Sequence, residues 1–385
     1  MASSEPPSDW LCCFSEVSDP RRTQGTYHAL RSVIGIALLA VLCGANDWAA
    51  IAAYGQEKAD WLGEFLALPC GTPSADTFER LFQRIDPVAF ELGFRQWVAQ
   101  IVEPLGLQVV ALDGKTHRGS YDAETNLKAL HTVSAWSSEH RLVLAEVAVS
   151  SKSNEITAIP PLLAMLNLVG AVVTMDAMGT QKTIAQQIRA QQADYILSLK
   201  PNHPNLYNAV ERWVKIAQAQ AWQGIIHQTA ATLEDGHHRH EQRQLWAIPV
   251  SQLATDDVLM AELARWQDCQ TVVVVWRRRE TWQKTTTEIQ FYLTSLPPEA
   301  ERLMALIRTH WSIENQLHWC LDVVFQEDQS RIRKGHSPRN FGLLRRLALS
   351  LLERETSFKA SLKRKRYKAL LNHDYLCTIL ATAFT

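Results

Sequence analysis

The stretch LDGKTHRGS, residues 112–120, is the most informative part of this chain because an apolar run ends there in a carboxylate. Residues 109–112 read as a buried strand, and Asp113 follows at once. A second apolar run, residues 172–175, ends in the same way at Asp176. A carboxylate is costly to desolvate without a cation or hydrogen-bond donors, so two strands that each end in an aspartate suggest a shared divalent ion. Either aspartate alone could equally cap a helix or form a turn.

A third carboxylate is predicted on a helix. Residues 299–324 read as one helix with an apolar face. Glu314 falls seven positions after Ile307 and three before Leu317, so it is expected to point along the core-facing stripe. His310 lies four residues before Glu314 on the same face. The alternative is that Glu314 belongs to a partly exposed polar edge of the helix.

The order of strand and helix patterns predicts the architecture. Three strand-like runs fall within residues 107–150, and helices then alternate with strands up to residue 199. This order, β-β-β-α-β-α-β-α, predicts a mixed sheet covered by helices and fits an RNase H-like fold. Residues from about 222 to 294 are rich in strand signals and read as a β-rich insertion, whereas residues 26–100 look mainly helical.

Three segments, in this order, resemble the DDE transposases of bacterial insertion sequences, in the branch that includes the H-repeat-associated proteins. They are LDGKTHRGS (112–120), VVTMDAMGTQKTIAQQI (172–188) and HWSIENQLHWCLDVVFQEDQSRIRKG (310–335). FSEVSDPRR (14–22), the apolar helix around IGIALLAVLCGANDW (34–48) and GTPSADTFERLF (71–82) look like the domain that precedes the catalytic core in that family. The resemblance implies that Asp113, Asp176 and Glu314 are the catalytic and metal-binding residues.

The chain departs from the wider superfamily around the third acid. Ile307, His310 and Leu321 stand where that superfamily has Tyr, Arg and Lys, which leaves open the cations that hold DNA beside Glu314. Six cations are predicted to bind DNA: Lys115, Arg118, Arg308, Arg331, Arg333 and Lys334.

The three acids imply a divalent metal cofactor. Two ions held by carboxylates can activate an oxygen on one side of a phosphorus and stabilise the leaving oxygen on the other. Mg²⁺ is the expected ion because it prefers oxygen ligands, and Mn²⁺ is a possible substitute. The resemblance implies that Asp113 bridges the ions, while Asp176 and Glu314 each complete one shell.

The predicted class is therefore α/β: an RNase H-like mixed sheet with flanking helices, a β-rich insertion before the last catalytic helix, and a helical N-terminal domain. The expected parts are an N-terminal extension (1–20), a helical transposase-associated domain (21–104), the first part of the catalytic core (105–204), the β-rich insertion (205–297), and the last part of the core with a basic helical C-terminal region (298–385).

Composition is consistent with this assignment but less specific. The 385 residues, 46% of them hydrophobic, suffice for two or three domains with substantial cores. The net charge is −1, yet residues 331–368 hold 13 Lys or Arg against 2 Glu, which indicates either a surface for a polyanion or a solvated basic helix. The 7 cysteines form no CxxC pair, so neither a zinc knuckle nor a disulfide framework is expected.

A cytoplasmic, nucleoid-associated bacterial protein without a membrane partner is expected. Residues 1–10 lack the basic start and apolar core of a signal peptide, and the apolar stretch from Val33 to Cys43 is too short to span a bilayer.

The leading functional hypothesis is a DNA transposase that cuts the ends of an insertion sequence and joins them to target DNA. The resemblance implies terminal inverted repeats and target DNA as partners, and a homodimer on DNA. Two alternatives remain open: a catalytically silent or domesticated DNA-binding relative, and an RNase H-like metal-dependent nuclease that cuts without joining.

Overall fold

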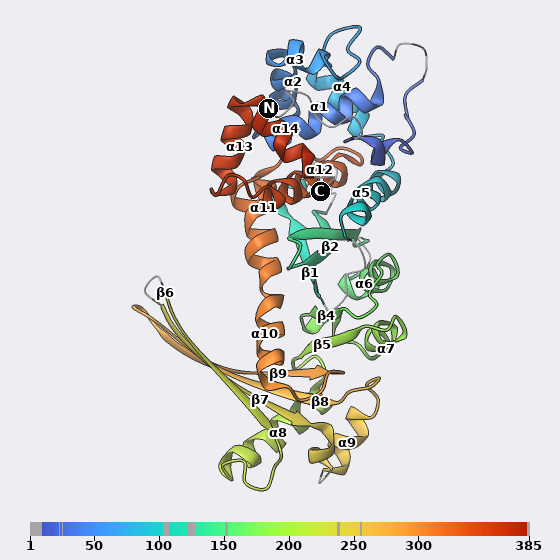
Figure 1. Ribbon diagram of the computed structural model, residues 1–385. Helices are drawn as coiled ribbons and strands as arrows, with labels where there is room; N and C mark the ends of the chain where they lie inside the picture. Colours follow the sequence, from blue (N-terminus) through green and yellow to red (C-terminus); the bar gives the residue numbers. More distant parts are fainter. Residues whose placement is uncertain are drawn as a thin grey trace. The chain divides into compact units, whose positions relative to one another are not determined.

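A computed structural model describes residues 10–22, 24, 26–102, 108–121, 128–150, 153–236, 239–254 and 256–382 of the chain (Figure 1). These residues form two compact units. Unit 1 comprises Met1–Glu103, Gly114–Ser153 and Glu314–Thr385, and unit 2 comprises Pro104–Asp113 and Asn154–Ile313. The limits of the two units therefore fall directly after Asp113 and directly before Glu314.

Unit 1 begins with a helical bundle. A short 3-10 turn, η1 (Cys12–Phe14), precedes the helices α1 (Leu30–Leu42), α2 (Trp48–Glu57), α3 (Ala59–Gly63), α4 (Ala75–Phe82) and α5 (Pro87–Ile101). Asp47, Ser74 and Asp86 accept hydrogen bonds from the first turns of α2, α4 and α5, which fixes where these helices start. Residues Ser32 to Leu42 of α1 are all buried, as expected of a helix that is apolar all round.

The C-terminal helices of unit 1 pack on this bundle. They are α11 (Trp319–Val323), η6 (Glu327–Gln329), α12 (Ser337–Arg354), α13 (Leu362–Leu371) and α14 (His373–Ala381). The long helix α12 contacts both α1 and α5, so segments from the two ends of the chain share one core (Figure 1). Two arginines inside α12, Arg345 and Arg346, are buried with its leucines.

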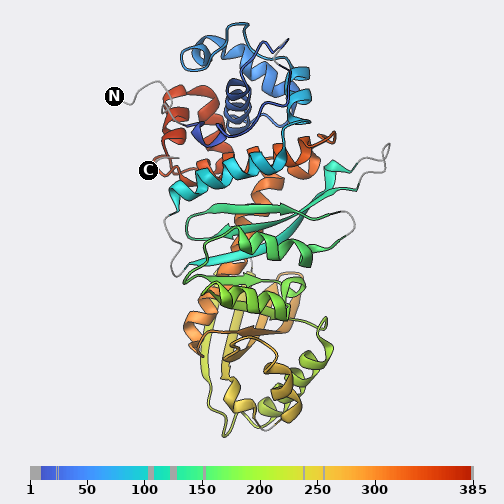
Figure 2. The same ribbon diagram turned by 90° about the vertical axis from the view of Figure 1, so that its right-hand side faces the viewer.

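A small sheet completes unit 1. It consists of β2 (Leu130–Ser137), β3 (Leu142–Ala148) and the last residues of β1 (Val109–His117), in the order β3-β2-β1. β2 and β3 pair antiparallel, and α5 and α12 pack against β3 (Figure 2). η2 (Arg118–Ser120) follows β1 and lies against η6. The pattern predicted a strand only up to Leu112, but β1 continues to His117.

Unit 2 is built on a mixed sheet. The first residues of β1 pair parallel with β4 (Val172–Met175), and β4 pairs parallel with β5 (Asp194–Leu199). From β5 the sheet continues antiparallel through β9 (Thr285–Thr294), β8 (Thr271–Thr281), β7 (Arg239–Pro249) and β6 (Gln228–Gly236). The strands predicted between residues 222 and 294 are therefore present, and through β9 they extend the sheet that contains β4.

Helices cover the sheet of unit 2. They are α6 (Glu155–Ala164), η3 (Ala177–Gly179), α7 (Lys182–Ala190), α8 (Pro204–Ala219), η4 (Val250–Leu253), α9 (Asp257–Leu263) and α10 (Ala300–His310). α10 lies along the sheet and contacts β4, β6 and β7 (Figure 1). Its Leu303, Met304 and Ile307 share one buried cluster with Val273 and Val275 of β8.

The predicted mixed α/β class with flanking helices is confirmed. The order β1, β2, β3, α6, β4, α7, β5, α8 matches the predicted order of strands and helices. The limits predicted for five separate domains stay a prediction. No helix among the described residues is both long and apolar enough to cross a membrane.

Candidate active site

Two of the predicted acids lie at the same edge of the sheet in unit 2. Leu112 of β1 is the register partner of Met175 of β4, and Asp113 and Asp176 are the next residue on each strand. Because the two strands are parallel neighbours, both carboxylates emerge where their pairing ends. Asp113 is half-buried and Asp176 is exposed.

A lysine from the third parallel strand contacts Asp176. Lys200 follows the end of β5, and its Nζ lies 2.8 Å from Oδ1 and 3.0 Å from Oδ2 of Asp176. Asp176 also accepts a 2.6 Å hydrogen bond from the Ala177 N–H as the cap of η3. Burial alone would raise the pKa of Asp176, but the bonds from Lys200 and Ala177 outweigh it and lower that pKa. This carboxylate is therefore ionised at neutral pH.

His310, at the end of α10, is a neutral neighbour of the two aspartates. Its Nδ1 lies 2.9 Å from Oγ1 of Thr174, a buried residue of β4. Burial lowers the pKa of His310, although the Asp113 and Asp176 carboxylates pull it upward. A neutral imidazole here adds no positive charge beside Asp113 and Asp176.

Residues 300–323 are helical apart from Trp311, in agreement with the prediction of one helix, but the prediction that Glu314 lies on its apolar face is wrong, and the alternative of a partly exposed polar edge is confirmed. α10 ends at His310, a π-helical segment spans Ile313–His318, and α11 begins at Trp319. Ile313 and Leu317 are buried, whereas Glu314 is exposed. The wider i to i+5 turn changes which residues share a face, so Glu314 leaves the stripe that a 3.6-residue period assigns to it. Such π segments are frequent at functional sites.

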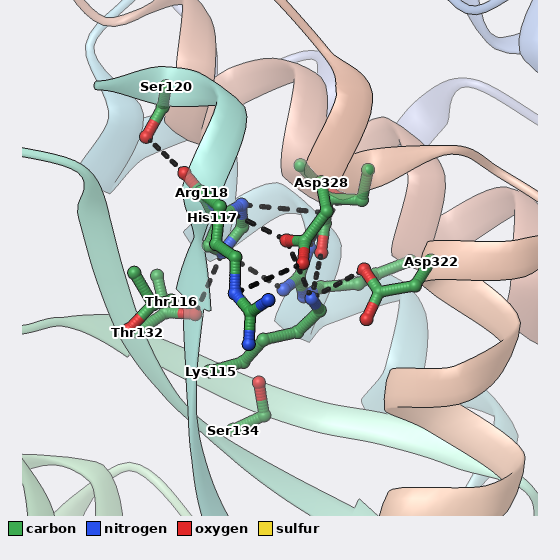
Figure 3. A network of polar contacts seen from close by, with 12 residues as sticks. Lys115, Thr116, His117, Arg118, Ser120, Thr132, Ser134, Asp322 and Asp328 are labelled. Carbon is green, nitrogen blue, oxygen red and sulfur yellow. Dashed lines mark hydrogen bonds and ion pairs between the residues drawn. The ribbon is translucent and has the colours of Figure 1, made fainter. Parts of the chain in front are cut away.

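Lys115 is held inside a network of carboxylates in unit 1 (Figure 3). Its Nζ lies 2.6 Å from Asp322, 3.3 Å from Asp328 and 3.8 Å from Glu327. The side chain is buried, so these three acids compensate its charge within the protein. The sequence predicted Lys115 as a phosphate ligand, and that role stays a prediction.

The buried centre of this network joins α12 to the small sheet. Arg346 donates to Glu327 at 2.9 Å and forms an ion pair with Glu146 of β3. His117 lies 3.1 Å from Thr132 of β2 and 3.6 Å from Glu327. Burial alone would raise the pKa of Glu327, but Arg346 and His117 reverse this and hold it below its usual range.

The other predicted DNA-binding cations have varied surroundings. Arg118 is 82% exposed, and its backbone N–H donates to Asp328 at 3.3 Å. Arg308 pairs with Glu234 on β6, and Lys334 lies 3.1 Å from Glu79. Arg333 donates to the Gly119 carbonyl, whereas exposed Arg331 has no hydrogen bond or ion pair to the residues that the structure describes.

The residues at the edge of the unit 2 sheet fit a divalent cation by their chemistry. Asp113 and Asp176 offer the oxygen ligands that Mg²⁺ prefers, and an ammonium group already lies on the Asp176 oxygens. Within the described ranges, no group of three or more His, Cys, Asp or Glu side chains could hold a metal ion.

Two features of the site were not predicted from the sequence. Lys200 is not among the predicted site residues, although it follows an apolar strand just as the two aspartates do, and that position was the available signal. Asp322 and Asp328 are not among the predicted site residues either, yet both contact Lys115. No local pattern reveals this contact because more than 200 residues separate the partners.

Comparisons with known proteins agree with this architecture. The family described as "Transposase DDE domain" matches residues 104–351, and the family described as "DDE_Tnp_1-associated" matches residues 11–98. The chain belongs to the DDE transposases, in the branch of the H-repeat-associated proteins, which confirms the resemblance stated from its motifs.

Relatives match over nearly the full length of the chain. "Putative transposase YncI" of Escherichia coli O157:H7 is 35% identical over 96% of this chain and 93% of its own length. "H repeat-associated putative transposase YhhI" of Escherichia coli strain K12 is 35% identical over 95% of this chain and 96% of its own length. The piggyBac transposase in a synaptic complex with hairpin DNA aligns with 97% of this chain and 80% of its own at 10% identity, with a TM-score of 0.43, which is too slight to define a fold.

Proposed function

We propose that this chain is a catalytically active transposase that cuts the ends of an insertion sequence and joins them to target DNA. The observation that carries the proposal is the placement of Asp113 and Asp176 at one edge of the sheet, on adjacent parallel strands. Two carboxylates side by side at strand ends suit a site for divalent ions and phosphate chemistry. The order of strands and helices supports the further proposal of an RNase H-like core with a β-rich insertion.

We assign the chemistry to Asp113, Asp176 and Glu314, which would hold the metal ions. Bound Mg²⁺, or Mn²⁺ in its place, would activate the attacking oxygen and stabilise the leaving oxygen. In the cutting step, water adds to phosphorus and the P–O3′ bond breaks, which leaves a 3′-hydroxyl and a 5′-phosphate. In the joining step, that 3′-hydroxyl attacks a phosphodiester of the target, and the target's own 3′-oxygen leaves.

The protein's own groups prepare Asp176 for this role. The ammonium of Lys200 and the Ala177 N–H keep its carboxylate ionised and fix its orientation. Lys115, Arg118, Arg308, Arg331, Arg333 and Lys334 are the proposed cations for DNA. A homodimer that holds two ends together is proposed from the family.

The test is an incubation of the protein with a labelled duplex that carries the terminal repeats flanking its gene. We expect cut and joined products with Mg²⁺ or Mn²⁺ and none with EDTA. Cutting without joining would instead identify a nuclease. Binding to the repeats without cutting, with either metal, would identify a silent relative and overturn the proposal.

A further inference from the structure

Unit 1 contains a cavity whose lining residues include none of the proposed catalytic acids. It has a volume of about 710 Å³, and the first residues of three helices line it: Trp48 of α2, Ala75 of α4 and Ser337 of α12. The other wall is the segment before α12, with Arg331, Arg333 and Lys334. Helix starts present backbone N–H groups and a partial positive charge, so this arrangement favours an anion.

Ser337 indicates, independently of the helix starts, that the cavity binds a ligand. This first residue of α12 is 1% exposed, and its Oγ finds no hydrogen-bond partner among the described residues. α12 is 18 residues long, and no side chain caps its start, in contrast to α2 and α4. A buried hydroxyl without a partner is costly, and a ligand oxygen in the cavity would satisfy it.

Among the described cations that line the cavity, one is available to bind a ligand. Lys334 is paired with Glu79 at 3.1 Å, and the Asp47 carboxylate is used by the Ala50 N–H at 2.8 Å. Arg333 donates its Nε to the Gly119 carbonyl. Arg331 is exposed and unpaired within the described part of the chain, so its guanidinium can meet an incoming oxyanion.

We propose that this cavity binds a single phosphate of the DNA backbone. The Ser337 hydroxyl donates to a phosphate oxygen, and Arg331 supplies the countercharge. A phosphodiester carries one negative charge, and it suits this wall better than a free phosphate dianion because two carboxylates, Asp47 and Glu79, also line the cavity. The identity of the polyanion rests on the proposed function, whereas the cavity and the hydroxyl do not.

The salt dependence of duplex binding tests the role of Arg331. Fluorescence anisotropy of a duplex with the terminal repeats gives the binding constant at several salt concentrations. Arg331→Gln should lower the slope of log K against log[salt] by about one, because one phosphate contact is lost. Arg364→Gln is the matched control, since it removes an exposed arginine from α13 of the same unit, and it should keep the wild-type slope.

A second pair of variants tests the hydroxyl. Ser337→Ala should weaken duplex binding about tenfold while the thermal midpoint stays constant or rises, because an unpaired buried hydroxyl is removed. Ser350→Ala is the control: Ser350 lies on the same helix, is also buried and unpaired, and does not line the cavity. A single neutral methylphosphonate, moved along the duplex, should find one position that weakens the wild type but not Ser337→Ala.

Each outcome separates the cavity from the catalytic proposal. If the protein cuts and joins DNA but neither variant changes the slope or the methylphosphonate pattern, the cavity inference is overturned and the proposed function stands. If Ser337→Ala cancels stabilisation by inorganic phosphate but leaves DNA binding unchanged, the cavity holds a free anion and the inference is overturned. A tight, cavity-dependent duplex complex without cutting would support the cavity and overturn the proposed catalysis.

Discussion

Lys200 holds both oxygens of Asp176 within hydrogen-bonding distance, and both side chains are about half exposed. An ammonium on a carboxylate at the end of a strand compensates the charge that a metal ion would otherwise compensate. The two cations would compete for the same oxygens. Lys200 is therefore expected to weaken metal binding by Asp176 at the proposed site.

We predict that Lys200→Met binds Mn²⁺ about two- to tenfold more tightly than the wild type, because the competing exposed ion pair is removed. Titration of free Mn²⁺ by electron paramagnetic resonance measures this without DNA. Lys215→Met is the control, since Lys215 pairs with Glu211 at 3.0 Å on the exposed side of α8. Weaker Mn²⁺ binding by Lys200→Met would show that Lys200 supports the site.

His117 gives a prediction about pH. Burial lowers its pKa against the opposing effect of Glu327, so the unfolded chain takes up a proton at a higher pH than the folded chain. The stability contribution is complete above the unfolded pKa of about 6.5 and is lost as pH falls towards the folded value. Between pH 8 and pH 5, the free energy of unfolding measured in urea should fall less for His117→Asn than for the wild type. An equal fall in the free energy of unfolding of the two proteins would contradict this explanation.

At the scale of elements, apolar runs were sufficient to predict β1, β4, β5 and the strands from β6 to β9. Periodicity reports one face of one segment, so it could not predict that β9 pairs with β5, or that β1 continues to His117 into the small sheet. Periodicity could not predict the π segment either, because a 3.6-residue period describes only α-helical turns. Asp113 and Asp176 could be found because both end local apolar runs.

The junction between α12 and β3 depends on one buried arginine. Arg346→Met should lower the free energy of unfolding by about 3–5 kcal/mol, because the Glu146 and Glu327 carboxylates stay buried without their partner. Adding Glu146→Leu and Glu327→Leu should restore most of this loss, since all three charges are then removed. Urea denaturation measures the free energy of unfolding of the single and the triple variant. An Arg346→Met protein as stable as exposed Arg364→Met would contradict the assignment.

At the scale of the whole molecule, the basic stretch 331–368 is less of a DNA surface than its composition indicates. Four of its 13 cations, Arg345, Arg346, Lys365 and Arg366, are buried. Lys365 and Arg366 donate to backbone carbonyls of unit 1, and Arg346 forms ion pairs with buried acids. Composition predicted the local charge correctly, but burial decides which charges can reach a partner.

The proposed function depends on the assignment of the chemistry to Asp113, Asp176 and Glu314. The most direct measurement is the rate of metal-dependent strand cleavage by Asp113→Asn, Asp176→Asn and Glu314→Gln beside Glu64→Gln and Glu299→Gln, exposed acids of unit 1 and unit 2. We expect each of the first three to lose about a thousandfold or more in rate while duplex binding is retained, and the two controls to stay within about twofold of the wild type. Cleavage by Asp113→Asn or Glu314→Gln at the wild-type rate would contradict the claim.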